Sequence, residues 1–134
     1  MIDNLSDFNP LKKQACEALK KRKIPTKDLY LCCDGKYRNR IVIPYYGRDG
    51  ELIFWNGRDI SGQAKARYRG PDKEEFNVGK SDVLWMSKWP AAGARIHLTE
   101  GEFDAMTLCL AGFNGAACGS KNVGEKQIEM LRGY

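Results

Sequence analysis

Zinc ligands are scarce in this sequence, which contains one histidine, His97. No two of its five cysteines are spaced as Cys-x-x-Cys; they are Cys16, Cys32, Cys33, Cys109 and Cys118. Structural zinc sites usually take four ligands from closely spaced cysteines and histidines. We therefore expect no zinc, and we interpret the cysteines as the reduced thiols of a cytosolic protein.

Long apolar runs are also lacking. No stretch approaches the roughly 20 apolar residues that a membrane helix needs. The opening MIDNLSDFNP is acidic and has no apolar core of a signal peptide. The sequence contains neither internal repeats nor low-complexity tracts. Its 134 residues, of which 43% are hydrophobic, predict one domain, or one domain with a small subdomain, and no membrane partner.

The positive charge is concentrated between residues 36 and 73. This stretch contains nine Lys or Arg and four Asp or Glu, so it carries the whole net charge of +5, and the remainder balances at 13 against 13. Six aromatic residues are interleaved with these cations: Tyr37, Tyr45, Tyr46, Phe54, Trp55 and Tyr68. Arginine beside exposed aromatic rings suits phosphates and stacked single-stranded bases. A solvated basic hairpin with its aromatic side chains in the core fits this composition equally well.

The first half of the chain predicts a helix followed by a β-hairpin. Asn9 can cap a helix that starts at Pro10, and apolar residues recur there at helical spacing. RIVIPYYGRDGELIFWNGRDI then contains two β-rich runs around an Asp-Gly turn, in which Pro44 marks an edge or the end of the first strand. ARYRGP predicts a short third strand, residues 70–82 a polar loop, and VLWMS a short apolar segment.

The last forty residues predict an alternation of strands and helices. ARIHLT and FNGAAC indicate strands, and EFDAMTLCLAG and EKQIEMLRG indicate helices, the second with Ile128 and Leu131 facing inward. Strand, helix, strand and helix joined by short loops are typical of a parallel sheet. We therefore predict a mixed α+β and α/β fold with three segments. These are an N-terminal helical segment (1–35), a basic β-rich subdomain (36–93) and the βαβα start of a parallel sheet (94–134).

Three acids cluster where the first of these late strands meets its helix, in LTEGEFDA. Ligands of open α/β sheets bind at the carboxyl ends of the strands, where Glu100 is expected, and Asp104 follows about one helical turn later. Hard cations such as Mg²⁺ prefer carboxylate oxygens. Acids also stabilise a helix N-terminus by roughly 0.3–1 kcal/mol each. The spacing leaves both interpretations open, and the side chain of Glu102 could equally face solvent.

Four segments of the sequence, in order, resemble segments of a known family. LTEGEFDAMTL resembles the opening motif of the Toprim domain, in the Glu-Gly-x-x-Asp version of bacterial DnaG-type primases and bacteriophage primase-helicases. Upstream, RNRIVIPYYGRDGELIFWNGRDI, KARYRGP and VLWMS resemble, in the same order, the basic subdomain that precedes Toprim in those primases. The resemblance covers about residues 38 to 132.

The resemblance implies RNA primer synthesis on single-stranded DNA in the cytoplasm of a bacterial cell or a phage-infected host. Glu100 is implied as the catalytic acid or base, and Asp104 as its companion; both are implied ligands of Mg²⁺ or Mn²⁺. The residues implied to bind nucleic acid or nucleotides are Arg38, Arg40, Arg58, Lys65, Arg67, Tyr68 and Lys121. Single-stranded DNA, nucleotides and a replicative helicase are the implied partners.

Two features of the family pattern are missing. No Asp-x-Asp follows Glu100, although the family binds its metals with that motif, and no zinc-ribbon cysteines precede residue 36. We therefore expect an incompletely liganded metal and no primer synthesis by these 134 residues alone. We also expect self-association through an unpaired edge of the two-stranded parallel sheet. The alternative is a module that binds nucleic acid or a replication partner without catalysis.

Overall fold

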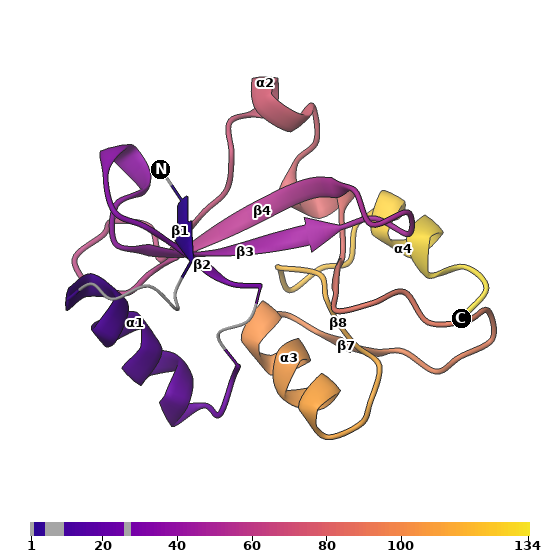
Figure 1. Cartoon of the computed structure of the whole chain (residues 1–134). Coiled ribbons are helices and arrows are strands. Elements are labelled where there is room, and N and C mark those ends of the chain that lie inside the picture. Colours follow the sequence, from indigo (N-terminus) through magenta and orange to yellow (C-terminus); the bar gives the residue numbers. More distant parts are fainter. Residues whose placement is uncertain (1, 5–9, 26–27) are drawn as a thin grey trace. The chain divides into compact units, whose positions relative to one another are not determined.

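The computed structural model describes residues 2–4, 10–25 and 28–134, and the cap predicted at Asn9 lies outside these residues (Figure 1). The chain divides into two compact units. One contains Met1–Pro44 and Trp55–Pro71, and the other contains Tyr45–Phe54 and Asp72–Tyr134. The expected segments 1–35, 36–93 and 94–134 stay a prediction. No helix in the described part of the chain is long and apolar enough to cross a membrane.

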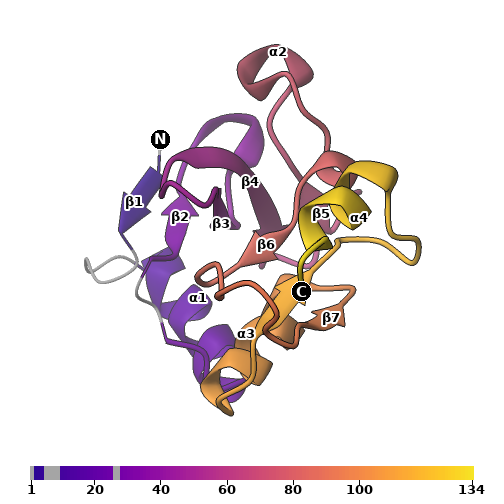
Figure 2. The same ribbon diagram turned by 90° about the vertical axis from the view of Figure 1, so that its right-hand side faces the viewer.

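A five-stranded sheet contains the predicted hairpin. Its strands are ordered β1-β2-β3-β4-β5, and the β1/β2, β2/β3 and β4/β5 pairs are antiparallel. The bounds are β1 (Ile2–Asn4), β2 (Tyr30–Cys32), β3 (Arg40–Tyr46), β4 (Leu52–Asp59) and β5 (Tyr68–Arg69). The predicted helix is α1 (Pro10–Lys21), and a 3-10 turn, η1, covers Gly35–Tyr37. Strands β1 and β2, which lie side by side in Figure 2, were not predicted. Three residues are too few for a strand to show an alternating pattern.

The turn of the hairpin has the expected chemistry. The amide of Gly47 donates to the carbonyl of Glu51 at 2.9 Å, and Gly50 adopts a positive φ of 82°, which glycine tolerates without strain. Pro44 lies inside the sheet, because β3 has neighbours on both sides. Since the pairing with β2 extends only to Val42, Pro44 removes no hydrogen bond of that ladder.

The second unit contains a three-stranded sheet ordered β6-β8-β7. Its elements are α2 (Lys73–Phe76), η2 (Lys80–Asp82), β6 (Trp85–Met86), β7 (His97–Thr99), α3 (Glu102–Leu110), β8 (Gly115–Ala117) and α4 (Glu125–Leu131). The predicted parallel pair is confirmed, because β7 pairs parallel with β8 across α3. The predicted loop 70–82 contains two short helical turns, α2 and η2. Small residues in β8 let α3 approach closely: a Cβ on Gly115 would collide with the carbonyl of Ala105.

The expected two-stranded sheet has a third strand. Strand β8 is not an open edge, because β6 pairs with it antiparallel, Trp85 opposite Ala117 and Met86 opposite Ala116. Leu84, Met86, Ala116 and Cys118 form the buried core of this layer. Among the described strands, β7 is left at the edge beside β8. Self-association therefore stays a prediction that concerns β7.

Candidate functional site

The predicted acidic site lies where β7 ends. The amide of Cys118 donates to the carbonyl of Thr99 at 3.0 Å, and the amide of Gly119 donates to the carbonyl of Glu100 at 2.7 Å. These bonds continue the β7/β8 ladder beyond both strands. They place Glu100 at the carboxyl end of β7 and attach the loop 119–122 to it.

Glu100 and Asp104 are both exposed. A Cβ on Gly101 would lie 3.7 Å from Oδ2 of Asp104, so the carboxylate of Asp104 turns back over the start of α3. Gly101 itself has an ordinary extended backbone, with φ −107° and ψ 150°. The carboxylate of Asp104 thus stands at the positive end of the helix dipole, which accommodates negative charge there, and Glu100 immediately precedes the N-cap Gly101.

In the described part of the chain, Glu100 and Asp104 belong to no larger cluster of potential metal ligands. Over residues 2–4, 10–25 and 28–134, no group of three or more His, Cys, Asp or Glu side chains could hold a metal ion. Two exposed carboxylates match the oxygen ligands that Mg²⁺ prefers, and this ion usually keeps several waters. The metal site predicted at Glu100 and Asp104 therefore stays a prediction.

The acid between them has a different environment. Glu102 is only 1% exposed, and its carboxylate accepts a hydrogen bond from the hydroxyl of Tyr45, which is itself buried. The ring of Tyr45 packs edge-on against Phe54, with centroids 5.3 Å apart. Glu102 therefore does not face solvent. It attaches the first residue of α3 to the segment 45–54.

A lysine that the sequence did not indicate also lies in this region. Gly119 has φ +78°, and a Cβ there would collide with the side chain of Lys80, whose aliphatic part therefore crosses directly over this glycine. Because the amide of Gly119 is hydrogen-bonded to the carbonyl of Glu100, the half-buried Lys80 lies close to the backbone at the carboxyl end of β7. Only the tertiary contact reveals it, since residues 70–82 look like a polar loop. The predicted Lys121 is exposed in the loop 119–122.

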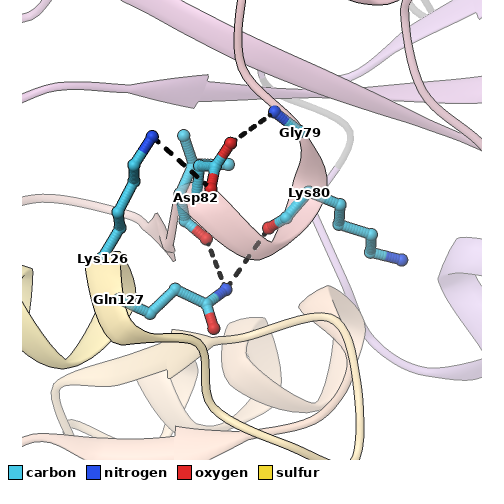
Figure 3. A network of polar contacts seen from close by, with 6 residues as sticks. Gly79, Lys80, Asp82, Lys126 and Gln127 are labelled. Carbon is cyan, nitrogen blue, oxygen red and sulfur yellow. Dashed lines mark hydrogen bonds and ion pairs between the residues drawn. The ribbon is translucent and has the colours of Figure 1, made fainter.

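Gln127 connects α4 to the η2 turn, where its side chain reaches the backbone of Lys80 (Figure 3). Its side chain is fully buried, and Nε2 donates to the carbonyls of Val83 at 2.7 Å and Cys118 at 2.8 Å, with Lys80 at 3.3 Å. Its Oε1 accepts the amide of Gly124 at 2.9 Å. The side-chain amide of Gln127 thus connects the start of α4 to the backbone of Lys80 and Val83 and to the residue that follows β8.

The predicted basic residues, except Lys121, belong to the first unit. Arg38, Lys65 and Arg67 are exposed. Arg58 and Tyr68 are half-buried and face each other across β4 and β5, with the guanidinium carbon 5.9 Å from the ring centroid. A cation over an aromatic ring is an arrangement that also binds stacked bases and phosphates.

Arg40 departs from its predicted role. It is 5% exposed, and its guanidinium donates to the carbonyls of Ala66 at 2.8 Å, Gly57 at 3.0 Å and Arg67 at 3.1 Å. The planar fork of arginine suits several acceptors at once. Arg40 therefore binds the protein's own backbone, and it connects β3 to β4 and to the segment that leads into β5.

Asp59 organises the other end of the loop between β4 and β5. Its carboxylate accepts the Ser61 hydroxyl at 2.7 Å and the amide of Gly62 at 2.8 Å, with the amides of Ser61 and Ala64 further away. Burial alone would raise the pKa of Asp59, but these hydrogen bonds outweigh it and hold the pKa below its ordinary value. The resulting stabilisation is complete above the pKa of the unfolded chain and is lost as the pH falls through the lower folded pKa.

We expect Arg40→Met to destabilise the fold, because three carbonyls lose a charged donor in a buried place. The free energy of unfolding should fall by about 2–3 kcal/mol in denaturant titrations. Arg38→Met, two residues away and exposed, should change it by less than about 0.5 kcal/mol. Equal stability of the two variants would contradict the structural role of Arg40.

Comparisons with known proteins agree with this fold. No family model matches the chain. The DNA primase of Synechococcus elongatus is 26% identical over 103 residues, which are 74% of this chain and 15% of that protein. The RNA polymerase domain of Mycobacterium tuberculosis primase DnaG, in complex with a double-stranded DNA oligomer with a 6-nucleotide overhang, matches with a TM-score of 0.75 at 17% identity. A structure of the DnaG primase catalytic domain bound to ssDNA matches with a TM-score of 0.72, also at 17% identity.

Each of these two matches covers 96% of this chain, but only 53% and 52% of the respective DnaG structures. The chain therefore spans about half of those structures and a smaller part of the curated primase. The sequence likeness and the fold point to the same proteins, which confirms the resemblance to DnaG-type primases. This chain has the fold of part of the DnaG-type primase catalytic core.

Proposed function

We propose that this chain is part of a DNA primase, which makes RNA primers on single-stranded DNA in the cytoplasm, alongside a replicative helicase. The observation that carries the proposal is the Glu-Gly-x-x-Asp turn at the carboxyl end of β7, within the fold of a DnaG catalytic core. Two of the matched DnaG structures contain DNA, one of them single-stranded. This supports the same class of ligand here.

In the proposed reaction, the 3′-hydroxyl of the growing primer attacks the α-phosphate of a nucleotide, and pyrophosphate leaves. Glu100 accepts the proton of the attacking hydroxyl, and its exposure leaves it accessible to substrate. Glu100 and Asp104 would hold Mg²⁺ or Mn²⁺, which when bound neutralises charge that develops on the phosphoryl oxygens. Lys80, whose aliphatic part crosses Gly119, and Lys121, exposed in the loop 119–122, would add positive charge for phosphates.

The basic residues of the first unit hold nucleic acid in this proposal. Arg38, Lys65 and Arg67 are exposed and can reach phosphates, and Arg58 with Tyr68 offers a cation and an aromatic ring together. Arg40 acts from inside, by holding the carbonyls of Ala66 and Arg67 in place.

A second candidate is a module that binds single-stranded nucleic acid and catalyses nothing. The observation that favours it is the pair of carboxylates without a third ligand in the described part of the chain. Chemistry on phosphates usually needs more negative ligands to hold its metals. The two candidates share the basic surface and differ in what Glu100 does.

Arg58→Ala tests the nucleic-acid surface that both candidates share. We expect weaker binding of single-stranded DNA, and the slope of log K against log salt should become shallower by about 0.7, the value for one phosphate contact. Fluorescence anisotropy with an oligothymidylate between 50 and 200 mM salt measures both. Arg132→Ala, which removes an exposed arginine paired with Glu129 on α4, is the control with the same charge change. Wild-type affinity and slope for the Arg58 variant would refute the proposed surface.

A further inference from the structure

The cations of the basic sheet lie on two opposite faces. In the antiparallel register of β4 and β5, Arg58 is opposite Tyr68, and Gly57 is opposite Arg69. Neighbouring residues of a strand point to opposite faces of its sheet. Arg58 and Tyr68 therefore share one face, in keeping with their cation–π contact, and Arg69 lies on the other.

Tyr37 is the centre of the second face. Its ring meets Trp55 edge-on, with centroids 4.7 Å apart and planes at 80°. Trp55 stands two residues before Gly57 on β4 and so lies on the same face as Arg69. The Tyr37 hydroxyl donates to the carbonyl of Gly70 at 3.1 Å. The ring is thus fixed by Trp55 on β4 and by the carbonyl of Gly70, the residue that follows β5.

Two exposed cations from distant segments meet at this ring. Nζ of Lys36 is 5.1 Å from the ring centroid, and the guanidinium carbon of Arg69 is 5.3 Å from it. Two exposed positive charges beside one ring attract anions, and this attraction does not depend on sequence. The phosphates of a nucleic-acid backbone are such anions, because each carries one negative charge that Lys or Arg can neutralise. The aromatic ring keeps the two cations in position for them.

The position of β5 lets one strand of nucleic acid reach both faces. In the order β1-β2-β3-β4-β5, strand β5 is the last, and only Tyr68 and Arg69 belong to it. The faces of Tyr68 and Arg69 therefore meet at this short edge, and a single strand that binds both has the shortest path around β5. OB folds, which also bind single strands on a basic and aromatic sheet surface, take about 4–16 nucleotides, and this range sets the lengths to test.

We propose that Lys36, Tyr37 and Arg69 form a second phosphate-binding face, which holds a different segment of the same single strand from the one at Arg58 and Tyr68. This inference rests on the proposed function, because it extends the nucleic-acid surface described there. The two faces differ in the length of strand that they require. A short oligonucleotide occupies the first face, and only a longer one passes around β5 to the second.

The test compares two lengths of oligothymidylate, about 5 and about 16 nucleotides, in salt titrations of the full chain. We expect the double variant Lys36→Ala with Arg69→Ala to bind the short oligonucleotide with the wild-type affinity and salt slope. For the long one, binding should weaken and the salt slope should become shallower by about 1.4, the value for two phosphates. Arg58→Ala should weaken both lengths. The double variant Lys88→Ala with Arg132→Ala, also two exposed cations, controls for net charge.

Three results would overturn the second face. The first is unchanged affinity of the Lys36 and Arg69 variant for the long oligonucleotide. The second is an equal loss of affinity for both lengths, and the third is a loss of affinity no larger than that of the charge control. A length-dependent loss in that variant, with no effect of Arg58→Ala, would support the second face and refute the first. Arg69→Lys keeps the charge and should keep the wild-type slope. Denaturant titration of each variant separates lost phosphate contacts from unfolding, since only the latter lowers the free energy of unfolding.

Discussion

Replacing Glu100 by glutamine is expected to lower primer synthesis by about 10²–10⁴-fold in the primase of which we propose that this chain is part. Glutamine keeps the shape of the side chain but can neither accept the proton of the attacking hydroxyl nor contribute negative charge to a metal. Loss of a general acid or base commonly has this magnitude. Incorporation of labelled ribonucleotides on a single-stranded template, with Mg²⁺ or Mn²⁺, measures the effect. Binding of single-stranded DNA should persist, because the basic surface is untouched.

The matched control for this variant is Glu125→Gln. Glu125 is also an exposed acid in the first turn of a helix, α4, and it is not one of the predicted site residues. A role limited to the helix dipole predicts equal, small effects for the two variants. If Glu100→Gln supports primer synthesis as well as Glu125→Gln does, Glu100 is only an acid at a helix start. The binding module then becomes the better description of the protein.

Gln127→Glu is expected to cause the largest loss of stability. The wild-type amide donates to the carbonyls of Val83 and Cys118 in a fully buried place, and a carboxylate would face those oxygens with no proton to donate. An uncompensated buried charge typically costs about 3–5 kcal/mol. Denaturant unfolding at pH 8 should show a loss of this size.

The pH dependence identifies the cause of that loss. Burial raises the pKa of a carboxyl group, and in its protonated form the new side chain regains one donor. The deficit should therefore be smaller at pH 5 than at pH 8, since the neutral form predominates below the raised pKa. Gln63→Glu, in an exposed loop, should cost less than about 0.5 kcal/mol at either pH. A deficit in Gln127→Glu that is small, or that does not change with pH, would contradict the role of Gln127.

Several elements follow from local sequence because local physics decides them. Asp-Gly between two β-rich runs predicts the hairpin of β3 and β4, since glycine at Gly50 accepts the positive φ that the turn requires. Helical spacing predicts α1 and α3, and a strand before α3 puts Glu100 at the carboxyl end of β7. The order of elements along the chain is enough to predict that position.

Burial of individual polar residues could not be predicted in this way. Glu100, Glu102 and Asp104 look alike in sequence, but Glu102 is buried because it meets Tyr45, which lies 57 residues away. The sequence alone predicts Arg38 and Arg40 equally well as phosphate ligands. Arg40 is buried because its guanidinium binds the carbonyls of Ala66 and Arg67. On α4, apolar Ile128 was expected to face inward, but it is 50% exposed while Gln127 is buried.

The sequence by itself determined the local elements, their order and the acidic turn, because backbone preference and side-chain periodicity act over a few residues. The tertiary structure decided which strands are neighbours, and it placed β6 beside β8, with Trp85 opposite Ala117. It also decided which cations face solvent and on which side of the sheet they stand. Those outcomes depend on hydrogen-bond acceptors and rings supplied by residues far apart in the chain, and no local pattern records such partners.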